Sequence, residues 1–462
     1  MYSSGLPRTY IFVIFFLLLG RSTHQNKPRN GAANQFNSPK MDPKETEALF
    51  EVMESISTDA VWRKAHPKPC INGVWPGLEC KLGADKLMHV TRLDFGYKPN
   101  PSCKKNAIFP SSIFKLQHLQ GLFMFQCFMH THTTIPTGFQ NLAPSLQQLS
   151  LRANTALSGE IPSELGSLKA LQVLTLSQNS LHGFIPQDLG KLSALLHLDL
   201  SYNSLNGPIP GKIGSLRVLK GLDLSYNNLR GPISPLVGNL KMLQKLDLSS
   251  NSLTGHIPVA LGSLKSMEFI ALSNNKFTGM FPPSLVNLQS LQYFIMDNNP
   301  MNFPLPAEFG SLRRLQELRL ANSGYSGPIP VSYGKLLNLS SLSLENNRVS
   351  GSIPPSLGNL SHIYHLNLSG NLLSGPVPFS TEFLHRLGKN IDLKGNVELC
   401  INASHAAQSY QYLGVGICGS PLLNPKLKSS KKSQGFSLHE MHWRMDIYIL
   451  GSWILYLLLA CK

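Results

Sequence analysis

The sequence predicts an α/β solenoid, a fold in which short coils of chain stack along one axis. Two observations lead to this prediction: asparagine recurs every 24 residues, and a short run of alternating aliphatic residues precedes each of these asparagines. A fixed period of this length indicates repeated structural units rather than separate globular domains. The asparagines in register are Asn179, Asn203, Asn227, Asn251, Asn275, Asn299, Asn347 and Asn371, and Ser323 interrupts the series.

The repeated pattern L-x-x-L-x-L-x-x-N explains how such coils hold together. Leucines at alternate positions of a short strand point inward, and stacking one coil on the next buries what a single coil could not bury. A buried asparagine amide needs hydrogen-bond partners, and it has them if its carbonyl and its NH2 group both contact backbone of adjacent turns. We therefore expect one asparagine rung per coil.

The N-terminal residues carry a targeting pattern. A basic start with Arg8 precedes an apolar run from Tyr10 to Leu19, and small residues follow. The run is too short for a membrane-spanning helix, which needs about 20 apolar residues. We therefore expect a signal peptide over residues 1–22, entry into the secretory pathway, and a flexible segment over residues 23–42.

The end coils of a solenoid need covers that differ in sequence from the repeats. Residues 43–115 are predicted to form an N-terminal cap, residues 116–396 about eleven repeats, and residues 397–420 a short C-terminal cap. Within the first cap, residues 45–56 have the spacing of an amphipathic helix. Its apolar face is formed by Leu49, Val52, Met53 and Ile56.

Each asparagine is followed by L-x-G-x-I-P, as in SGEIP, NGPIP and TGHIP. In these residues the chain resembles the plant-specific class of extracellular leucine-rich-repeat proteins, over roughly residues 45 to 420. The resemblance implies a superhelix with parallel strands on its concave face and a second strand in each L-x-G-x-I-P segment. Ser234 stands where proline is expected and Phe303 where glycine is expected, so we expect irregular coils at both places.

The resemblance also suggests how six cysteines pair. Cys70, Trp75, Gly77 and Cys80 resemble the end of the N-terminal cap of this class, which implies a disulfide between the two cysteines. A secreted protein would allow oxidation, although spacing alone does not prove pairing. Cys127 occupies a rung position, where a buried thiol is one interpretation and a bridge to Cys103 is the favoured one. The expected second clamp joins Cys400 and Cys418.

Charge and motifs exclude several function classes. The formal charge of +16 falls to +7 when residues 1–40 (+5) and 420–462 (+4) are subtracted, which suits a soluble surface with mild attraction to acidic polymers rather than a nucleic-acid groove. The sequence has no G-x-S-x-G, H-E-x-x-H or G-x-x-x-x-G-K-[ST] pattern. The close pair His130 and His132 lacks further metal donors nearby, so we interpret it as a polar turn. We expect no cofactor, no metal and no enzyme.

A candidate binding surface follows from the register. Repeat proteins bind partners on concave strands, whose outward residues lie six, four, two and one positions before each rung. In three neighbouring coils these positions hold aromatic, aliphatic and charged residues, a composition common in binding hot spots. The predicted partner-binding residues are Phe269, Ala271, Tyr293, Ile295, Asp297, Glu317 and Arg319. Asp199, Asp223 and Asp247 occupy the same position in three consecutive repeats. We interpret them as residues typical of the repeat sequence rather than as a binding site.

Four N-x-S/T sequons predict glycosylation near the C-terminal end of the solenoid. They are Asn338, Asn359, Asn367 and Asn402. The segment HLNLS places Asn367 on the concave strand face, where a glycan would block the last coils.

The C-terminal residues indicate anchoring. Residues 421–446 are predicted to be a basic linker and residues 447–462 a hydrophobic membrane-anchor tail, either a lipid-attachment signal or a short spanning segment. The function implied by the resemblance is that of a cell-surface receptor-like protein without a kinase, which binds a peptide or the ectodomain of a receptor kinase. The alternative is a secreted inhibitor of microbial wall-degrading enzymes, similar to polygalacturonase inhibitors. Those inhibitors end near a cap with four cysteines, whereas this chain has two and continues beyond Cys418.

Overall fold

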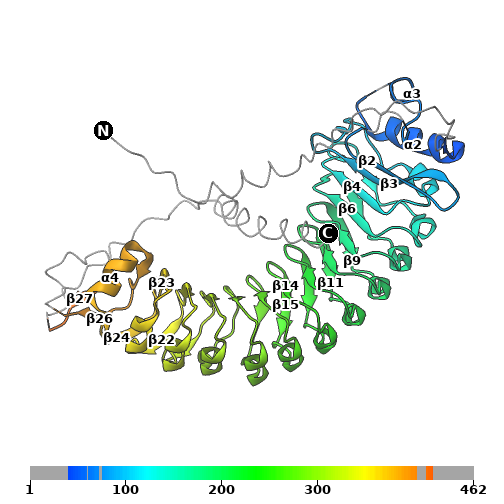
Figure 1. The fold of residues 1–462 in the computed structure, drawn as a ribbon. Coiled ribbons are helices and arrows are strands. Elements are labelled where there is room, and N and C mark those ends of the chain that lie inside the picture. The colour runs from blue at the N-terminus through cyan, green and yellow to red at the C-terminus, as the bar shows by residue number, and fades with distance from the viewer. Residues whose placement is uncertain (1–39, 60, 72–74, 403–412, 420–462) are drawn as a thin grey trace, which may run out of the picture.

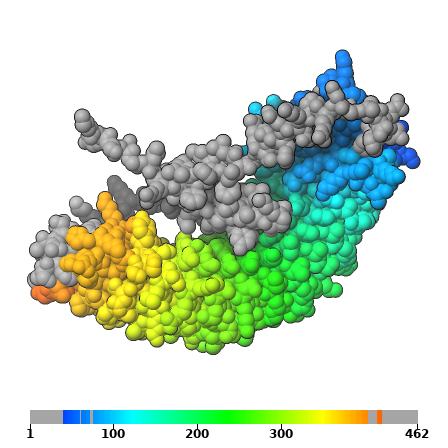
Figure 2. All heavy atoms as spheres, in the orientation of Figure 1, coloured from blue at the N-terminus to red at the C-terminus, as the bar shows by residue number. Residues whose placement is uncertain are grey.

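The computed structural model describes residues 40–59, 61–71, 75–402 and 413–419. These residues form one arc of stacked coils, with strands along the inner side and short helical turns along the outer side (Figure 1). The space-filling view shows a continuous packed body from the blue N-terminal cap to the orange C-terminal coils (Figure 2). The expected signal peptide, the basic linker and the anchor tail lie outside the described residues. Within those residues, no helix has the length and apolar character needed to span a bilayer.

The concave side is a 15-stranded sheet in which all neighbours are parallel except β2 and β3. Its strands are β1 (Lys40–Met41), β2 (Leu78–Leu82), β3 (Leu87–Phe95), β4 (Gly121–Phe125), β6 (Gln148–Arg152), β8 (Val173–Thr175), β10 (His197–Asp199), β12 (Gly221–Asp223), β14 (Lys245–Asp247), β16 (Phe269–Ala271), β18 (Tyr293–Ile295), β19 (Glu317–Arg319), β21 (Ser341–Ser343), β23 (His365–Asn367) and β25 (Ile391–Asp392).

The L-x-G-x-I-P segments form two further parallel sheets. The first contains β5 (Thr133–Thr134), β7 (Leu157–Gly159), β9 (Ser180–Phe184), β11 (Ser204–Gly207), β13 (Asn228–Gly231), β15 (Ser252–Gly255) and β17 (Lys276–Phe277). The second contains β20 (Ser326–Gly327), β22 (Arg348–Gly351), β24 (Leu372–Pro376), β26 (Glu398–Ile401) and β27 (Gly416–Ile417).

Each coil crosses the convex side as a turn of 3₁₀ helix. These turns are η2 (Ser111–Lys115), η3 (Phe139–Leu142), η4 (Ser163–Ser167), η5 (Gln187–Lys191), η6 (Gly211–Ser215), η7 (Pro235–Asn239), η8 (Val259–Ser263), η9 (Pro283–Asn287), η10 (Ala307–Ser311), η11 (Val331–Lys335) and η12 (Pro355–Asn359), with η13 (Gly388–Asn390) near the end. The α-helices are α2 (Pro43–Ile56), α3 (Trp62–Ala65) and α4 (Thr381–Leu387).

The core is a continuous column of inward leucines. Leu198, Leu222 and Leu246 pair with one another across three adjacent strands and are almost fully buried. Burial of about 25 cal/mol per Å² of apolar surface, repeated in every coil, is the main stabilising contribution of this fold. The predicted solenoid of parallel concave strands is confirmed.

The asparagine ladder has the predicted chemistry. The Asn227 carbonyl accepts a hydrogen bond from the backbone N–H of Leu205 at 3.0 Å, and its NH2 group donates to the carbonyls of Leu200 and Leu224 at 3.0 and 3.2 Å. Where Ser323 interrupts the series, its hydroxyl donates to the Ala321 carbonyl at 2.8 Å. The Asn347 carbonyl then accepts from the N–H of Ser323 as well as from that of Tyr325.

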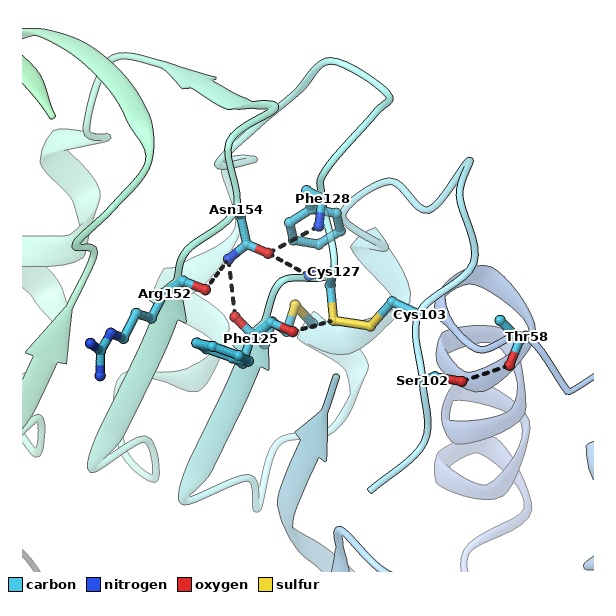
Figure 3. Close-up of a disulfide and its surroundings, with 9 residues drawn as sticks. Thr58, Ser102, Cys103, Phe125, Cys127, Phe128, Arg152 and Asn154 are labelled. Atoms are coloured by element: carbon cyan, nitrogen blue, oxygen red, sulfur yellow. Dashed lines mark hydrogen bonds between the residues drawn. A yellow bond between two sulfur atoms is a disulfide. The ribbon is translucent and has the colours of Figure 1, made fainter. Parts of the chain in front are cut away.

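Cys127 begins the ladder and is joined to Cys103 in the structure (Figure 3). The next rung, Asn154, covers the backbone here: its carbonyl accepts from the N–H groups of Cys127 and Phe128 at 2.7 and 2.9 Å (Figure 3). Disulfides also join Cys70 to Cys80 and Cys400 to Cys418. All three expected pairs are therefore present.

The N-terminal cap is longer than the sequence suggests. Helix α2 begins at Pro43 because the Asp42 carboxylate accepts hydrogen bonds from the N–H groups of Lys44 and Glu45. Lys40–Met41 pair with β3, so the segment expected to be flexible through residue 42 is ordered from residue 40. The four predicted apolar residues of the helix are fully buried against the first coils.

The two unusual coils behave differently. The coil with Ser234 is regular, because the Ser234 hydroxyl caps η7 by accepting from the N–H of Leu236 at 3.3 Å, so the expectation of irregularity there was wrong. At Phe303 the expected irregularity of the coil is confirmed. The second-layer sheet ends at β17 and resumes at β20, with an isolated bridge between Pro304 and Ser326.

Candidate ligand-binding surface

Three adjacent strands bring most of the predicted binding residues together. In β16, β18 and β19, Phe269 pairs with Tyr293 and Tyr293 with Glu317, while Ile295 pairs with Arg319. Parallel neighbours lie about 4.8 Å apart, so these side chains form one continuous surface. We call Phe269, Tyr293, Ile295, Glu317 and Arg319 the concave patch.

The aromatic part of the concave patch is held in place by its neighbours. The rings of Phe269 and Tyr293 have centroids 6.0 Å apart, and both side chains are half-buried. The Tyr293 hydroxyl donates to Gln316 Oε1 at 3.1 Å, and Gln316 Nε2 donates to Gln292 Oε1 at 3.2 Å. Burial, helped by the charge of Glu317, raises the pKa of Tyr293, so its hydroxyl remains a neutral donor. The surface is therefore amphipathic and partly preorganised.

Two predicted binding residues are not solvent-facing. Ala271 and Asp297 are each 4% exposed. Ala271 is a small residue between Asp247 and Ile295 in the strand pairing, and these larger neighbours cover it. Asp297 lies two positions before its rung, where the strand has ended and the side chain turns toward the next coil.

The position two before the rung is in fact mostly internal. Ser201, Ser225, Ser273 and Ala321 occupy it in other coils and are buried as well. The next residue has a positive φ, near +53° at Tyr202, which turns the chain into the rung. The predicted set of outward positions therefore contained one position too many, the position two residues before the rung.

The buried Asp297 side chain holds Arg319 of the concave patch in place. One carboxylate oxygen accepts from the N–H of Ala321 at 2.8 Å, and the other lies 2.7 Å from an Arg319 guanidinium nitrogen. Burial raises the pKa of Asp297, and the positive charge of Arg319 opposes this effect. Arg319 remains 32% exposed along its side chain. It can therefore contact a ligand while it neutralises a buried carboxylate.

The sequence reasoning missed Lys245, which extends the surface by one strand. Its ammonium nitrogen lies 2.8 Å from Asp223 Oδ2 and 5.7 Å from the centre of the Phe269 ring. Lys245 pairs directly with Phe269 across β14 and β16. Its position 24 residues before Phe269 was the signal that could have found it.

The aspartates that share one position form an electrostatic feature next to the concave patch. Asp199, Asp223 and Asp247 pair with one another in β10, β12 and β14. Burial and the negative charge of Asp223 raise the pKa of Asp247 to about 7, and the same two causes raise the pKa of Asp199. Burial acts against the Lys245 ammonium, but the charges of Asp223 and Asp247 outweigh it and raise the Lys245 pKa. One half of the concave face, which we call the acidic half, therefore carries carboxylates that ionise less readily than free ones, and the other half is aromatic with a cation.

The remaining predicted sites have clear positions. Asn338, Asn359 and Asn402 are exposed, and Asn367 lies in β23 of the concave sheet, where its side chain contacts Glu345 and Ser369. Within the described ranges, no group of three or more His, Cys, Asp or Glu side chains is arranged to hold a metal ion. Glycan occupancy stays a prediction.

Comparison with known families supports the repeat assignment. A family model described as "Leucine-rich repeat region" matches residues 212–381, and one described as "Leucine rich repeat" matches residues 144–205 and 170–229. Together they extend from residue 144 to residue 381, which is just over half of the 462 residues.

Three curated proteins of Arabidopsis thaliana are similar to parts of the chain. Receptor like protein 29 is 57% identical over 178 residues, 38% of this chain and 37% of that protein. Protein TOO MANY MOUTHS is 37% identical over 151 residues, 32% of this chain and 30% of that protein. Piriformospora indica-insensitive protein 2 is 33% identical over 144 residues, 30% of this chain and 34% of that protein. The chain thus spans about a third of the length of these relatives.

The segments VTRLDFGYKPNPSC, LQGLFMFQCF and LRLANSGYSGPIP predict a resemblance to Piriformospora indica-insensitive protein 2 first and to TOO MANY MOUTHS more distantly. Similarity to both proteins is confirmed, but the predicted order is wrong. The aligned part of Receptor like protein 29 is 57% identical, against 37% for TOO MANY MOUTHS and 33% for Piriformospora indica-insensitive protein 2.

Solved structures of plant receptor ectodomains share the fold. The structure of PEPR1 with AtPEP1 has a TM-score of 0.65 and 29% identity, and covers 78% of this chain and 49% of that one. The leucine-rich-repeat ectodomain of the Arabidopsis receptor kinase HAESA with an IDA peptide hormone has a TM-score of 0.63 and 27% identity, and covers 78% of this chain and 58% of that one. The repeats, the ladder and the family models agree: the chain belongs to the leucine-rich-repeat proteins, and it is similar to plant receptor-like proteins and receptor ectodomains.

Proposed function

We propose that this chain is a non-catalytic receptor-like protein at the plant cell surface that binds an extended peptide or a receptor-kinase ectodomain on its concave sheet. The observation that carries the proposal is the concave patch. It places two packed aromatic rings, an aliphatic side chain and a partly exposed guanidinium on adjacent strands. Aromatic and arginine side chains of this kind dominate the binding energy of protein interfaces.

The likeness to solved ectodomains supports the class of ligand. PEPR1 was solved with AtPEP1, and the HAESA ectodomain with a peptide hormone. An extended peptide along the concave sheet would cross several coils, and its side chains would meet the acidic half and the aromatic half in turn. We expect a cationic residue of the ligand near Asp199 and Asp247, and an apolar residue over Phe269 and Tyr293.

Attachment to the membrane and signalling through a borrowed kinase are part of the same proposal. The tail at residues 447–462, which lies outside the described residues, is the proposed anchor. Release of the tagged full-length protein from plant membranes by phosphatidylinositol-specific phospholipase C would identify a lipid anchor, and retention would indicate a spanning tail. Protein found free in the apoplast would favour the secreted-inhibitor alternative.

The direct test is a binding panel. The full-length protein is presented to a synthetic library of short peptides and to a set of purified receptor-kinase ectodomains. Binders are then measured against the variant Phe269→Ala/Tyr293→Ala/Ile295→Ala. We expect at least a tenfold rise in Kd, equal to about 1.4 kcal/mol, because the variant removes the apolar contacts of the patch.

The design leaves Arg319 unchanged, because its removal would leave the buried Asp297 carboxylate without its cation and destabilise the fold. A matched control removes three exposed apolar side chains from the convex turns: Leu236→Ala/Val259→Ala/Val331→Ala. This control should bind like the unaltered protein. Binders that respond to the convex variant and ignore the concave one would refute the proposal, as would a panel with no concave-dependent binder.

A further inference from the structure

One flank of the solenoid carries positive charge almost without negative charge. We call this surface the basic flank: the segments that lead from each 3₁₀ turn to the next concave strand, 165–172, 189–196, 213–220, 237–244, 261–268, 285–292, 309–316 and 333–340. They contain nine cationic residues and one acidic residue, Glu268; three further carboxylates, Glu164, Asp188 and Glu308, stand one position before three of the segments, and Asp188 pairs with Lys191. The cations are Lys169, Lys191, Arg217, Lys220, Lys241, Lys265, Arg313, Arg314 and Lys335. The opposite flank, from each rung to the next 3₁₀ turn, has only two lysine or arginine residues over the corresponding coils, Arg230 and Lys276, and Arg348 follows in the next coil.

The cations of the basic flank stand in register. Arg217, Lys241 and Lys265 occupy the same place in three consecutive coils, 24 residues apart. The N–H groups of Arg217 and Lys241 each donate at 2.9 Å to the carbonyl two residues earlier, and Lys169 and Arg313 do the same. The side chains of these four residues therefore start from the same local backbone conformation. Because coils stack about 4.8 Å apart, the result is an evenly spaced row of positive charge.

This row is not neutralised within the part of the chain that the structure describes. Arg217, Lys241 and Lys265 are exposed, and no ion pair of the described residues includes them. The side-chain hydrogen bond of Arg217 goes to a neutral acceptor, the Asn239 carbonyl at 3.4 Å. Lys169 likewise donates only to the carbonyls of Gly166 and Lys191. Like charges at this spacing repel one another, and an anionic partner would relieve that repulsion.

The chemistry of the flank selects among polyanions. The only aromatic residues in these segments are Phe309 and Tyr333, and both are buried. Single-stranded nucleic acids bind through base stacking on exposed aromatic rings, which this surface lacks. The adjacent side chains Val218 and Met242 are exposed, but they form too small an apolar face to insert into a bilayer. The remaining candidate partner is a linear polyanion that lies flat on the surface and has one anionic group in each repeating unit.

We propose that the basic flank binds a linear polyuronate, an acidic polysaccharide with a carboxylate on each sugar unit. Guanidinium and ammonium groups form charge-assisted hydrogen bonds with carboxylates, and a guanidinium can hold both oxygens. A repeating carboxylate chain laid along the axis would meet the row of Arg217, Lys241 and Lys265 coil by coil. The inference does not rest on the proposed function, because the concave patch lies on a different surface and can be occupied at the same time.

The test uses polygalacturonate as the probe and the full-length protein. The flank variant is Arg217→Glu/Lys241→Glu/Lys265→Glu. The matched control is Arg230→Glu/Lys276→Glu/Arg348→Glu, which has the same change in net charge on the opposite flank, where its three cations are also exposed. We expect the flank variant to bind at least tenfold more weakly and the control to stay within threefold. Affinity of the unaltered protein should fall as salt is raised from 50 to 300 mM, because screening weakens exposed ion pairs.

Further arms separate this inference from simpler ones. Fully methyl-esterified polygalacturonate, which has the same backbone without charge, should not bind. The neutral variant Arg217→Gln/Lys241→Gln/Lys265→Gln guards against misfolding and should also lose most of the binding. The concave variant Phe269→Ala/Tyr293→Ala/Ile295→Ala should bind polygalacturonate normally, which separates this outcome from the proposed function. If both charge-reversal variants lost the same amount of affinity for polygalacturonate, binding would depend on net charge alone, and the proposal would be overturned. Tighter, flank-dependent binding of phosphatidylserine vesicles or of a single-stranded oligonucleotide would do the same.

Discussion

At the scale of single residues, Asn227 shows how one side chain joins two coils. Its amide group satisfies one backbone N–H and three carbonyls, and all of these groups are buried. The alanine variant would leave them without partners in a dry environment. A buried polar group without a hydrogen bond costs about 1–3 kcal/mol. The Asn227 side chain therefore contributes more to the free energy of unfolding than a single hydrogen bond would.

We predict that Asn227→Ala lowers the free energy of unfolding by about 3 kcal/mol, because several backbone groups lose their partner together. Urea denaturation of the purified protein measures the change. The neighbouring Asn228→Ala is the control, since Asn228 is exposed, and its effect should stay below about 0.5 kcal/mol. Similar losses in the two variants would contradict the role assigned to the ladder.

His89 links the N-terminal cap to the first strands through two acidic side chains. Its Nδ1 lies 2.7 Å from Glu45 Oε2 and its Nε2 lies 3.0 Å from Asp85 Oδ2. Burial opposes the charged imidazole, but the two carboxylates outweigh it and raise the pKa of His89. Because the folded-state pKa lies above the unfolded value, this contribution is full at pH below about 6.5 and is lost as pH rises through the folded pKa.

We therefore predict that His89→Gln destabilises the cap at pH 5.5 by about 1–2 kcal/mol and has a smaller effect at pH 8.5. Fluorescence of Trp62 and Trp75, which pack together in the cap with ring centres 4.8 Å apart, reports its melting. The unaltered protein should lose cap stability across this range more steeply than the variant. Parallel pH profiles for the two proteins would show that His89 does not carry the dependence.

At the scale of elements, the coil around Phe303 interrupts an otherwise regular array. The second-layer sheet stops at β17 and resumes at β20, and the N–H of Ser326 donates to the Phe303 carbonyl at 3.1 Å as part of a lone bridge. Glycine at this position in other coils has a positive φ, as at Gly255. A phenylalanine disfavours that conformation, so the coil gives up its second strand.

We predict that the amides of Phe303 and Leu305 exchange with solvent at least tenfold faster than those of β13 and β15. The reason is that these two amides lie outside the paired strands of this layer, whereas the N–H groups of Met301 and Asn302 donate to the carbonyls of Asn299 and Ser323. Hydrogen–deuterium exchange followed by mass spectrometry resolves these peptides. Equal protection across residues 252–305 would mean that the interruption has no energetic consequence.

The elements that the sequence predicted are those set by its period. A 24-residue repeat fixes which residues share a position, and it identified the concave strands and the rungs, whereas the helical spacing of residues 45–56 identified the apolar face with Leu49 and Met53. It does not fix where a strand ends in space, so Asp297 and Ala271 were expected on the surface and are buried. Contacts between coils, such as Lys245 with Asp223, depend on side-chain length and direction, which the repeat pattern does not contain.

At the scale of the whole molecule, the two long surfaces of the arc differ in chemistry. The concave sheet changes from carboxylates at Asp199 and Asp247 to aromatic rings and a guanidinium at Arg319. On the basic flank, seven of the eight segments carry at least one cation, and Arg217, Lys241 and Lys265 form a regular row. A surface that varies from coil to coil suits a ligand of defined sequence, whereas a regular row of charge suits a repeating polymer. The solenoid thus offers a specific site and a general one on the same scaffold.

The most direct test of the central claim is to locate the ligand on the surface. A photoreactive benzoyl-phenylalanine replaces Ile295 in the concave patch in one protein and Val259 on the convex turn η8 in another. Each full-length protein is irradiated with the partner found in the binding panel. We predict a covalent adduct from position 295 and none from position 259. An adduct from position 259, with none from position 295, would contradict the assignment of the concave sheet as the binding surface.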